Sequence, residues 1–120
     1  AEVREVLAAD LTGDGKVEVL AGSRNCYVLC LDAAGKVLWR RNLLDAIVSM
    51  LTADVNGDGR PEIVVGVEDG TLHVLDAGGA ELNAFRTDGS ITDVAIAGRG
   101  EGALAIIAGS ADGKVYALGQ

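Results

Sequence analysis

One segment occurs three times along the chain at an almost constant interval, and this repetition limits the folds open to it. The sequence ADLTGDGKVEVLAGS at positions 9–23 returns as ADVNGDGRPEIVVGV at 53–67 and, more degraded, as IAGRGEGALAIIAGS at 96–110. Successive copies are 44 and then 43 residues apart. A repeat of this length indicates an array of similar structural units.

Each unit is built from short apolar or alternating runs separated by Gly and Asp, a pattern that predicts strands joined by hairpins. The 17 glycines and the 3% aromatic content agree with tight turns around a core of small aliphatic side chains. Helical repeats are disfavoured, because a glycine inside a helix costs about 1 kcal/mol relative to alanine. The expected strands cover 5–9, 17–22, 26–31, 37–42, 48–53, 62–67, 71–75, 81–86, 92–97, 103–109 and 114–118.

Four short antiparallel strands in a repeat of about 44 residues have the size of one blade of a β-propeller. The expected fold is therefore all-β: a single propeller segment with blade 1 at 1–44, blade 2 at 45–88 and blade 3 at 89–120. The last blade lacks its fourth strand. An open β-sandwich of similar strands is the alternative fold.

Three blades do not close a ring, since closed propellers hold roughly four to eight. We expect the ring to be completed by other copies of the chain, two of which would give six blades, or by the remaining blades of a longer chain. An unpaired strand edge at the incomplete third blade is a natural place for a partner strand.

The first two units share an acidic loop with the pattern D-x-[TN]-G-D-G-[KR]-x-E. Calcium takes six to eight oxygen ligands, and side chains at alternate loop positions can turn inward around one ion while glycine permits the bend. The residue after that glycine would bind through its carbonyl oxygen. The candidate ligands are Asp10, Thr12, Asp14, Lys16 and Glu18 in the first loop, and Asp54, Asn56, Asp58, Arg60 and Glu62 in the second.

These loops have two other interpretations. An EF-hand needs a glutamate at loop position 12, where this chain has Ala21 and Val65, so that interpretation fails. A metal-free Asp/Gly hairpin held by side-chain hydrogen bonds stays open, although three crowded carboxylates repel one another without a cation. The third unit has Ala97, Arg99 and Ala105 at ligand positions and keeps only Glu101, so no calcium is expected there.

The stretch DVNGDGRPEIVVG is very similar to the signature of FG-GAP or VCBS-type repeats, the calcium-loop blades also found in integrin α-subunit propellers. The resemblance spans all three units. It implies blade-borne calcium and a role in adhesion or protein recognition. Thr12 stands where Asn or Asp is usual, which implies weaker binding at the first loop.

LDAAGKVLW at 31–39 also resembles the blade signature of pyrroloquinoline-quinone-type propellers. We interpret this motif as blade architecture without that cofactor.

The net charge of −8 argues against nucleic acid as a partner, because phosphate binding requires a basic surface. No apolar run approaches the roughly 20 residues that cross a bilayer, so no membrane partner is expected.

The weak calcium affinity of such loops indicates an extracellular, cell-surface or periplasmic location. Two cysteines that cannot pair within one expected strand, Cys26 and Cys30, weigh slightly against a strongly oxidising compartment.

No catalytic residue is expected. His73 is the single histidine and occupies a packing position in the third strand of its unit. Trp39 is expected to pack between blades, with stacking on a sugar as its alternative. The leading functional hypothesis is a non-catalytic calcium-binding propeller that acts as a protein-recognition or adhesion scaffold. The alternatives are a carbohydrate-binding or polysaccharide-cleaving propeller and a pure assembly element.

Overall fold

The computed structural model describes residues 3–23, 26–54, 61–87, 89–98, 104–110 and 113–119, and within these ranges every regular element is a strand. The strands form three separate antiparallel sheets in which chain neighbours pair. They are β1 (Val3–Ala9), β2 (Glu18–Ser23), β3 (Tyr27–Leu31), β4 (Val37–Asn42), β5 (Ile47–Ala53), β6 (Glu62–Val67), β7 (Thr71–Leu75), β8 (Glu81–Arg86), β9 (Ile91–Gly98), β10 (Leu104–Ser110) and β11 (Val115–Gly119).

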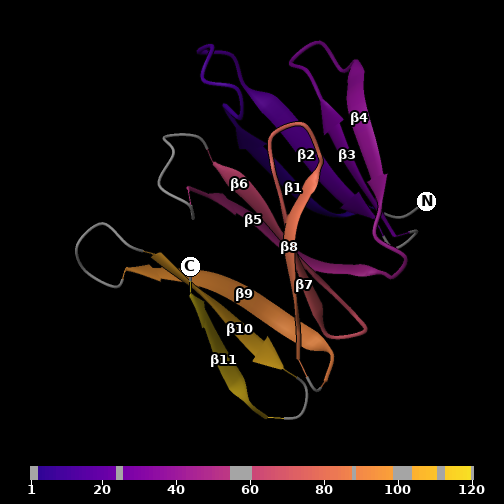
Figure 1. The fold of residues 1–120 in the computed structure, drawn as a ribbon. Coiled ribbons are helices and arrows are strands. Elements are labelled where there is room, and N and C mark those ends of the chain that lie inside the picture. The colour runs from indigo at the N-terminus through magenta and orange to yellow at the C-terminus, as the bar shows by residue number, and fades with distance from the viewer. Residues whose placement is uncertain are drawn as a thin grey trace.

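The predicted all-β propeller fold is confirmed. Sheets β1–β4 and β5–β8 are four-stranded meanders, and the third sheet has the three strands β9–β11 among the described residues. Figure 1 shows the sheets following one another from indigo through magenta and orange to yellow. The first strands adjoin, since β5 contacts both β1 and β9. This places the alanine-rich first strands at the inner side of the array.

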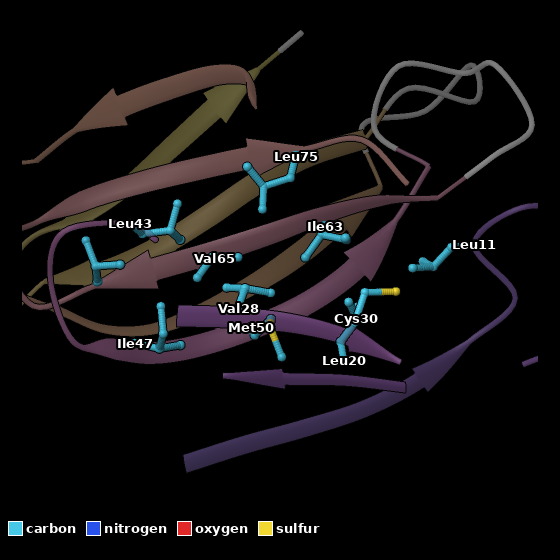
Figure 2. Packing of buried hydrophobic residues seen from close by; sticks show 11 residues of the cluster. Leu11, Leu20, Val28, Cys30, Leu43, Ile47, Met50, Ile63, Val65 and Leu75 are labelled. Carbon is cyan, nitrogen blue, oxygen red and sulfur yellow. The ribbon is translucent and has the colours of Figure 1, made fainter. Parts of the chain in front are cut away.

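The core lies between successive sheets. One cluster joins Leu20 and Val28 of the first sheet to Ile47 and Val65 of the second, and Figure 2 shows these side chains facing one another. A second cluster joins Val64 of the second sheet to Ile106 of the third. Because side chains alternate along a strand, β6 supplies both clusters and is buried along its whole length. The middle sheet is thus covered on both faces.

Close packing between sheets depends on glycine at one repeated position. A Cβ atom on Gly22 would lie 2.8 Å from Cγ2 of Ile47, and one on Gly66 would lie 2.6 Å from Cγ2 of Ile91. Ile47 and Ile91 are themselves buried, with 0% and 2% exposed. The repeated glycine lets the first strand of the next blade approach.

The outward faces of the first and third sheets are open. Val6 is 63% exposed, whereas its repeat equivalent Met50 is 4% exposed between sheets one and two. Val115 is 75% exposed, whereas its equivalent Leu72 is fully buried between sheets two and three. The same positions are therefore buried wherever a neighbouring blade is present.

Within the described ranges no helix has the length and apolar character to span a membrane.

The start of β3 differs from the sequence prediction. We expected the third strand to begin at Cys26, but Cys26 has a φ of 75° and β3 begins at Tyr27. The carbonyl oxygen of this left-handed residue accepts a 2.7 Å hydrogen bond from the amide of Leu43, the residue that follows β4. Cys26 and Cys30 are both free thiols.

Candidate metal centre

The first acidic loop connects β1 and β2 and is organised around Asp10. Its Oδ1 accepts a 2.9 Å hydrogen bond from the Gly13 amide, and its Oδ2 accepts one of 2.8 Å from the Gly15 amide. Both glycines have positive φ, 79° and 82°, in a region that other residues rarely adopt. The two glycines of the motif therefore allow the chain to fold back over the Asp10 carboxylate.

Glu18 closes the loop from the first residue of β2, where it pairs with Ala9. Its side chain is 5% exposed, and Oε1 accepts a 2.8 Å hydrogen bond from the Leu11 amide. Leu11 is itself fully buried and belongs to the core between the first two sheets. Burial of Leu11 in the core thus holds the loop against the sheet, and the Glu18 carboxylate accepts the hydrogen bond of the Leu11 amide.

The structure brings three of the five predicted ligands of the first loop together. One carboxylate oxygen from each of Asp10, Asp14 and Glu18 lies within 4.8 Å of the others. Oxygens bound to one calcium ion at 2.3–2.6 Å are separated by at most roughly 5 Å, so this spacing is compatible with a shared ion. The donors are all oxygen, which suits a hard cation better than zinc. The residues present therefore fit calcium.

Asp14 is the most exposed of the three carboxylates, and its hydrogen bonds favour the charged form. The pKa of Asp14 is lowered below 3.8, chiefly because the Lys16 amide donates a 2.8 Å hydrogen bond to Oδ1. The Thr12 hydroxyl and the Lys16 charge lower this pKa further. Asp14 is therefore ionised, and available as a ligand, throughout the neutral pH range.

A surface hollow of about 430 Å³ lies beside this loop. Thr12, Lys16 and Glu18 line it from the loop, and Asp32 lines it from the turn between β3 and β4. Sequence reasoning did not single out Asp32, because its proximity to the loop depends on sheet pairing and not on local spacing. Its motif, Leu-Asp-Ala-Ala-Gly, indicates only blade architecture.

The second loop can be followed only at its two ends, Asp54 and Glu62. Glu62 pairs with Ala53 across β5 and β6, in the same register as Glu18 with Ala9, and is 2% exposed. The other predicted ligands, Asn56, Asp58 and Arg60, lie outside the described residues. In the third unit Ala105 pairs with Ala97 at the equivalent position, while Arg99 and Glu101 also lie outside the described residues.

Trp39 packs between blades. Its indole Nε1 donates a 2.8 Å hydrogen bond to the carbonyl oxygen of Ala77, and the ring is so close to Gly79 that a Cβ there would lie 2.7 Å from it. The indole is thus engaged in holding sheets one and two together.

His73 and Cys30 both lie in the sheets. His73 is partly buried in β7, and its Nδ1 lies 2.5 Å from Oε1 of Glu81 on the neighbouring strand. Cys30 is 1% exposed in the core. Its pKa is raised to about 11 by burial and by the negative charge of Glu18. A thiol with this pKa stays protonated at neutral pH and is a poor nucleophile.

Consecutive antiparallel sheets, packed face to face with their first strands adjoining, define a segment of a β-propeller. The family model of the lambda-carrageenase β-propeller domain matches residues 1–52 and 42–120, and the chain belongs to this family. No curated protein matches the chain significantly.

Several solved structures share the fold. BBS1N in its complex with ARL6DN has a TM-score of 0.76 and 18% identity, over 96% of this chain and 34% of that chain. Sqt1 from Saccharomyces cerevisiae has a TM-score of 0.78 and 17% identity, over 96% and 32% of the two chains. BamB from Moraxella catarrhalis has a TM-score of 0.65 and 23% identity, over 86% and 30%. The chain therefore spans about a third of the length of these structures.

Proposed function

We propose that this chain is a non-catalytic, calcium-stabilised propeller module that serves as a scaffold for recognising another macromolecule. The observation that carries the proposal is the convergence of Asp10, Asp14 and Glu18, whose carboxylate oxygens lie within 4.8 Å of one another. Three negatively charged carboxylates held this close repel one another. A divalent cation would relieve that repulsion and tie the loop to the base of β2.

The second loop supports the same interpretation. Its sequence repeats the acidic pattern, and its two ends share the register of the first loop at the Ala53–Glu62 pair. The resemblance to FG-GAP or VCBS-type repeats implies a calcium ion at both loops. We propose one or two ions per chain. Because such loops bind calcium weakly, an extracellular or periplasmic location, where calcium reaches millimolar levels, suits them best.

The exposure of Val6 and Val115 on the outward faces supports completion of the ring by further blades. We propose that these are supplied by other copies of the chain, as in a six-bladed dimer, or by the rest of a longer chain. BBS1N, which shares the fold, was solved in complex with ARL6DN, and this supports protein recognition as a role. Protein recognition is accordingly the proposed role of the completed module.

Isothermal titration calorimetry with calcium tests the metal site directly. The full chain should bind calcium, and the double variant Asp14→Asn with Glu18→Gln should lose one class of site, because both changes keep the shape of the side chain and remove its charge. Glu68→Gln is the matched control, since Glu68 is exposed and lies outside the loop. Binding that is unchanged in the double variant would exclude the first loop as the site.

A carbohydrate-related function is the second candidate, and the family name favours it. Trp39, the aromatic residue considered for sugar stacking, is engaged with Ala77. A sugar would therefore have to bind elsewhere on the propeller. Screening the full chain on a glycan array with calcium present tests this candidate. Specific glycan binding that chelator abolishes would favour the carbohydrate function over protein recognition.

A further inference from the structure

Three basic residues lie along the outer edge of blade 1, and we call them the basic edge. Lys36 comes directly before β4, and Arg40 and Arg41 lie within it. The blade fold does not require these charges, because the equivalent positions one 44-residue period later hold the uncharged residues Ala80, Ala84 and Phe85. In a chain of net charge −8, the basic edge is a local excess of positive charge.

The arginines of the basic edge have no acidic partner within the part of the chain that the structure describes. In blade 2, by contrast, Arg86 of β8 lies 3.7 Å from Asp69. The Arg40 guanidinium instead lies over the ring of Tyr27, with Cζ 5.4 Å from the ring centroid. A stacked guanidinium is held in place while its N–H donors stay free to bind an anion.

The β4 strand has a neighbour on one side only. The order of the first sheet is β1-β2-β3-β4, so β4 pairs with β3 and forms the outer edge of the described sheet (Figure 1). An edge strand presents backbone amides and carbonyls to which another extended segment can add. Val37 and Leu38 at the start of β4 are 51% and 48% exposed. The edge therefore offers hydrogen-bonding, apolar and cationic groups together.

Arg40 and Arg41 lie on opposite faces of the sheet, because side chains alternate along a strand. Arg40 shares a face with Tyr27, and Arg41 shares the face of Trp39, which packs toward blade 2. A residue of an added strand lies on the same face as the residue that it opposes. Two adjacent carboxylates on the segment would thus meet one guanidinium each, in the two-bond geometry that arginine favours. An apolar residue two positions from the first carboxylate would lie against Leu38.

We infer that β4 of blade 1 is the docking edge for an extended acidic segment of a protein partner, with two adjacent carboxylate side chains opposite Arg40 and Arg41. This inference rests on the protein-recognition role proposed above, and it names the surface and the chemistry of the partner. Blade 2 offers no equivalent edge, since β8 has Ala84 and Phe85 at the two arginine positions and begins with the acidic Glu81.

NMR titration of the calcium-loaded full chain with a synthetic peptide tests the inference. The probe is a threonine-rich extended peptide with two adjacent glutamates and one valine, and the matched peptide has glutamines in place of the glutamates. At millimolar concentration the glutamate peptide should shift the amide resonances of β4 and slow their hydrogen exchange. The amides of β8 should not change. The glutamine peptide should bind about tenfold more weakly, because it cannot form charge-assisted hydrogen bonds.

Arg40→Glu and Arg86→Glu are a matched pair of variants, because each reverses one charge on the fourth strand of a blade. Arg40→Glu should weaken binding of the glutamate peptide about tenfold or more, whereas Arg86→Glu should change it less than about twofold. The difference should shrink at high salt, which screens exposed charges. Thermal unfolding checks that both variants fold, and Arg40→Gln gives a milder second test that removes the charge without reversing it.

Several results would overturn the inference. Equal binding of the two peptides would remove the role of the charges, and shifts confined to amides outside β4 would remove the edge. Failure of both peptides to bind would mean that the arginines only keep the edge strand from pairing. Arg40-dependent binding of a sulfated oligosaccharide by a chain that binds neither peptide would assign the basic edge to a glycan.

Calcium stoichiometry, measured on the same samples, reports separately on the proposed metal function. A chain that holds calcium but does not bind the glutamate peptide would contradict only the docking edge.

Discussion

The indole nitrogen of Trp39 donates a 2.8 Å hydrogen bond to the carbonyl oxygen of Ala77, which lies 38 residues further along the chain. This bond links the fourth strand of one blade to the last turn of the next. It acts with the apolar cluster between the two sheets, to which Trp39 and Ala77 both contribute. Neighbouring blades are therefore joined at their outer edge as well as through their buried faces.

Replacing Trp39 with phenylalanine should destabilise the protein by about 1–2 kcal/mol, because the aromatic ring is largely retained while the Ala77 carbonyl loses its donor. The free energy of unfolding in urea measures this loss. Leu38→Ala is the control: Leu38 is the adjacent residue and is 48% exposed, so its truncation should cost less than about 0.5 kcal/mol. Equal effects from the two variants would contradict a role for the hydrogen bond.

Gly66→Ala should destabilise the protein by about 1–3 kcal/mol, the range for overpacking a closely packed core. The added methyl group would meet Cγ2 of Ile91 at 2.6 Å and Cγ2 of Val94 at 3.2 Å. Gly78→Ala is the matched control, since its nearest contact would be 3.5 Å from an Asp76 oxygen and its φ is not positive. Thermal unfolding of the two variants compares them, and a neutral Gly66→Ala would mean that the sheets can separate freely at this position.

Cys26 and Cys30 should differ sharply in reactivity. Cys30 is 1% exposed and has a pKa of about 11, so its reactive thiolate is scarce at pH 8. Cys26 is partly exposed. Iodoacetamide at pH 8 should therefore add one label, and peptide mapping should find it on Cys26. The variant Cys26→Ser should take up no label while folded and one label in denaturant; rapid labelling of Cys30 in the native protein would contradict its buried position.

The carboxyl group of Asp14 should titrate below pH 3.8 in the metal-free protein, because the Lys16 amide and the Thr12 hydroxyl stabilise its charged form. A lowered pKa means that these bonds stabilise the fold above the unfolded pKa, and that this contribution is lost as the pH falls through the folded value. Carbon-detected NMR of the carboxyl group measures the midpoint. Thr12→Val removes one of the donors and should raise it, and a midpoint that stays the same in this variant would exclude the hydroxyl as a cause.

Much of the fold was predictable from local patterns. The observed strands begin and end within two residues of the expected positions, because Gly and Asp mark the hairpins and the apolar runs mark the sheets. The register at Ala9–Glu18 and the convergence of Asp10, Asp14 and Glu18 follow from the same local spacing. The start of β3 was wrong by one residue, because the alternation pattern does not reveal the left-handed conformation of Cys26.

Contacts between blades could be predicted from the sequence only in part. The motif at 31–39 predicts a blade, and the sequence also predicts that Trp39 packs between blades. The sequence does not reveal that Trp39 donates a hydrogen bond to Ala77 and that its ring packs on Gly79, because these contacts depend on how the two sheets are placed in space. The same is true of Asp32, which reaches the hollow beside the acidic loop only through the pairing of β3 with β2 and β4.

Native mass spectrometry of the full chain, recorded in calcium and again after chelation, tests whether the acidic loops bind calcium, because it counts metal ions and chains in one spectrum. We expect one or two calcium ions per chain that chelator removes, and loss of one ion when Asp10 is replaced with asparagine. A spectrum in ample calcium that shows only the metal-free mass would contradict this expectation.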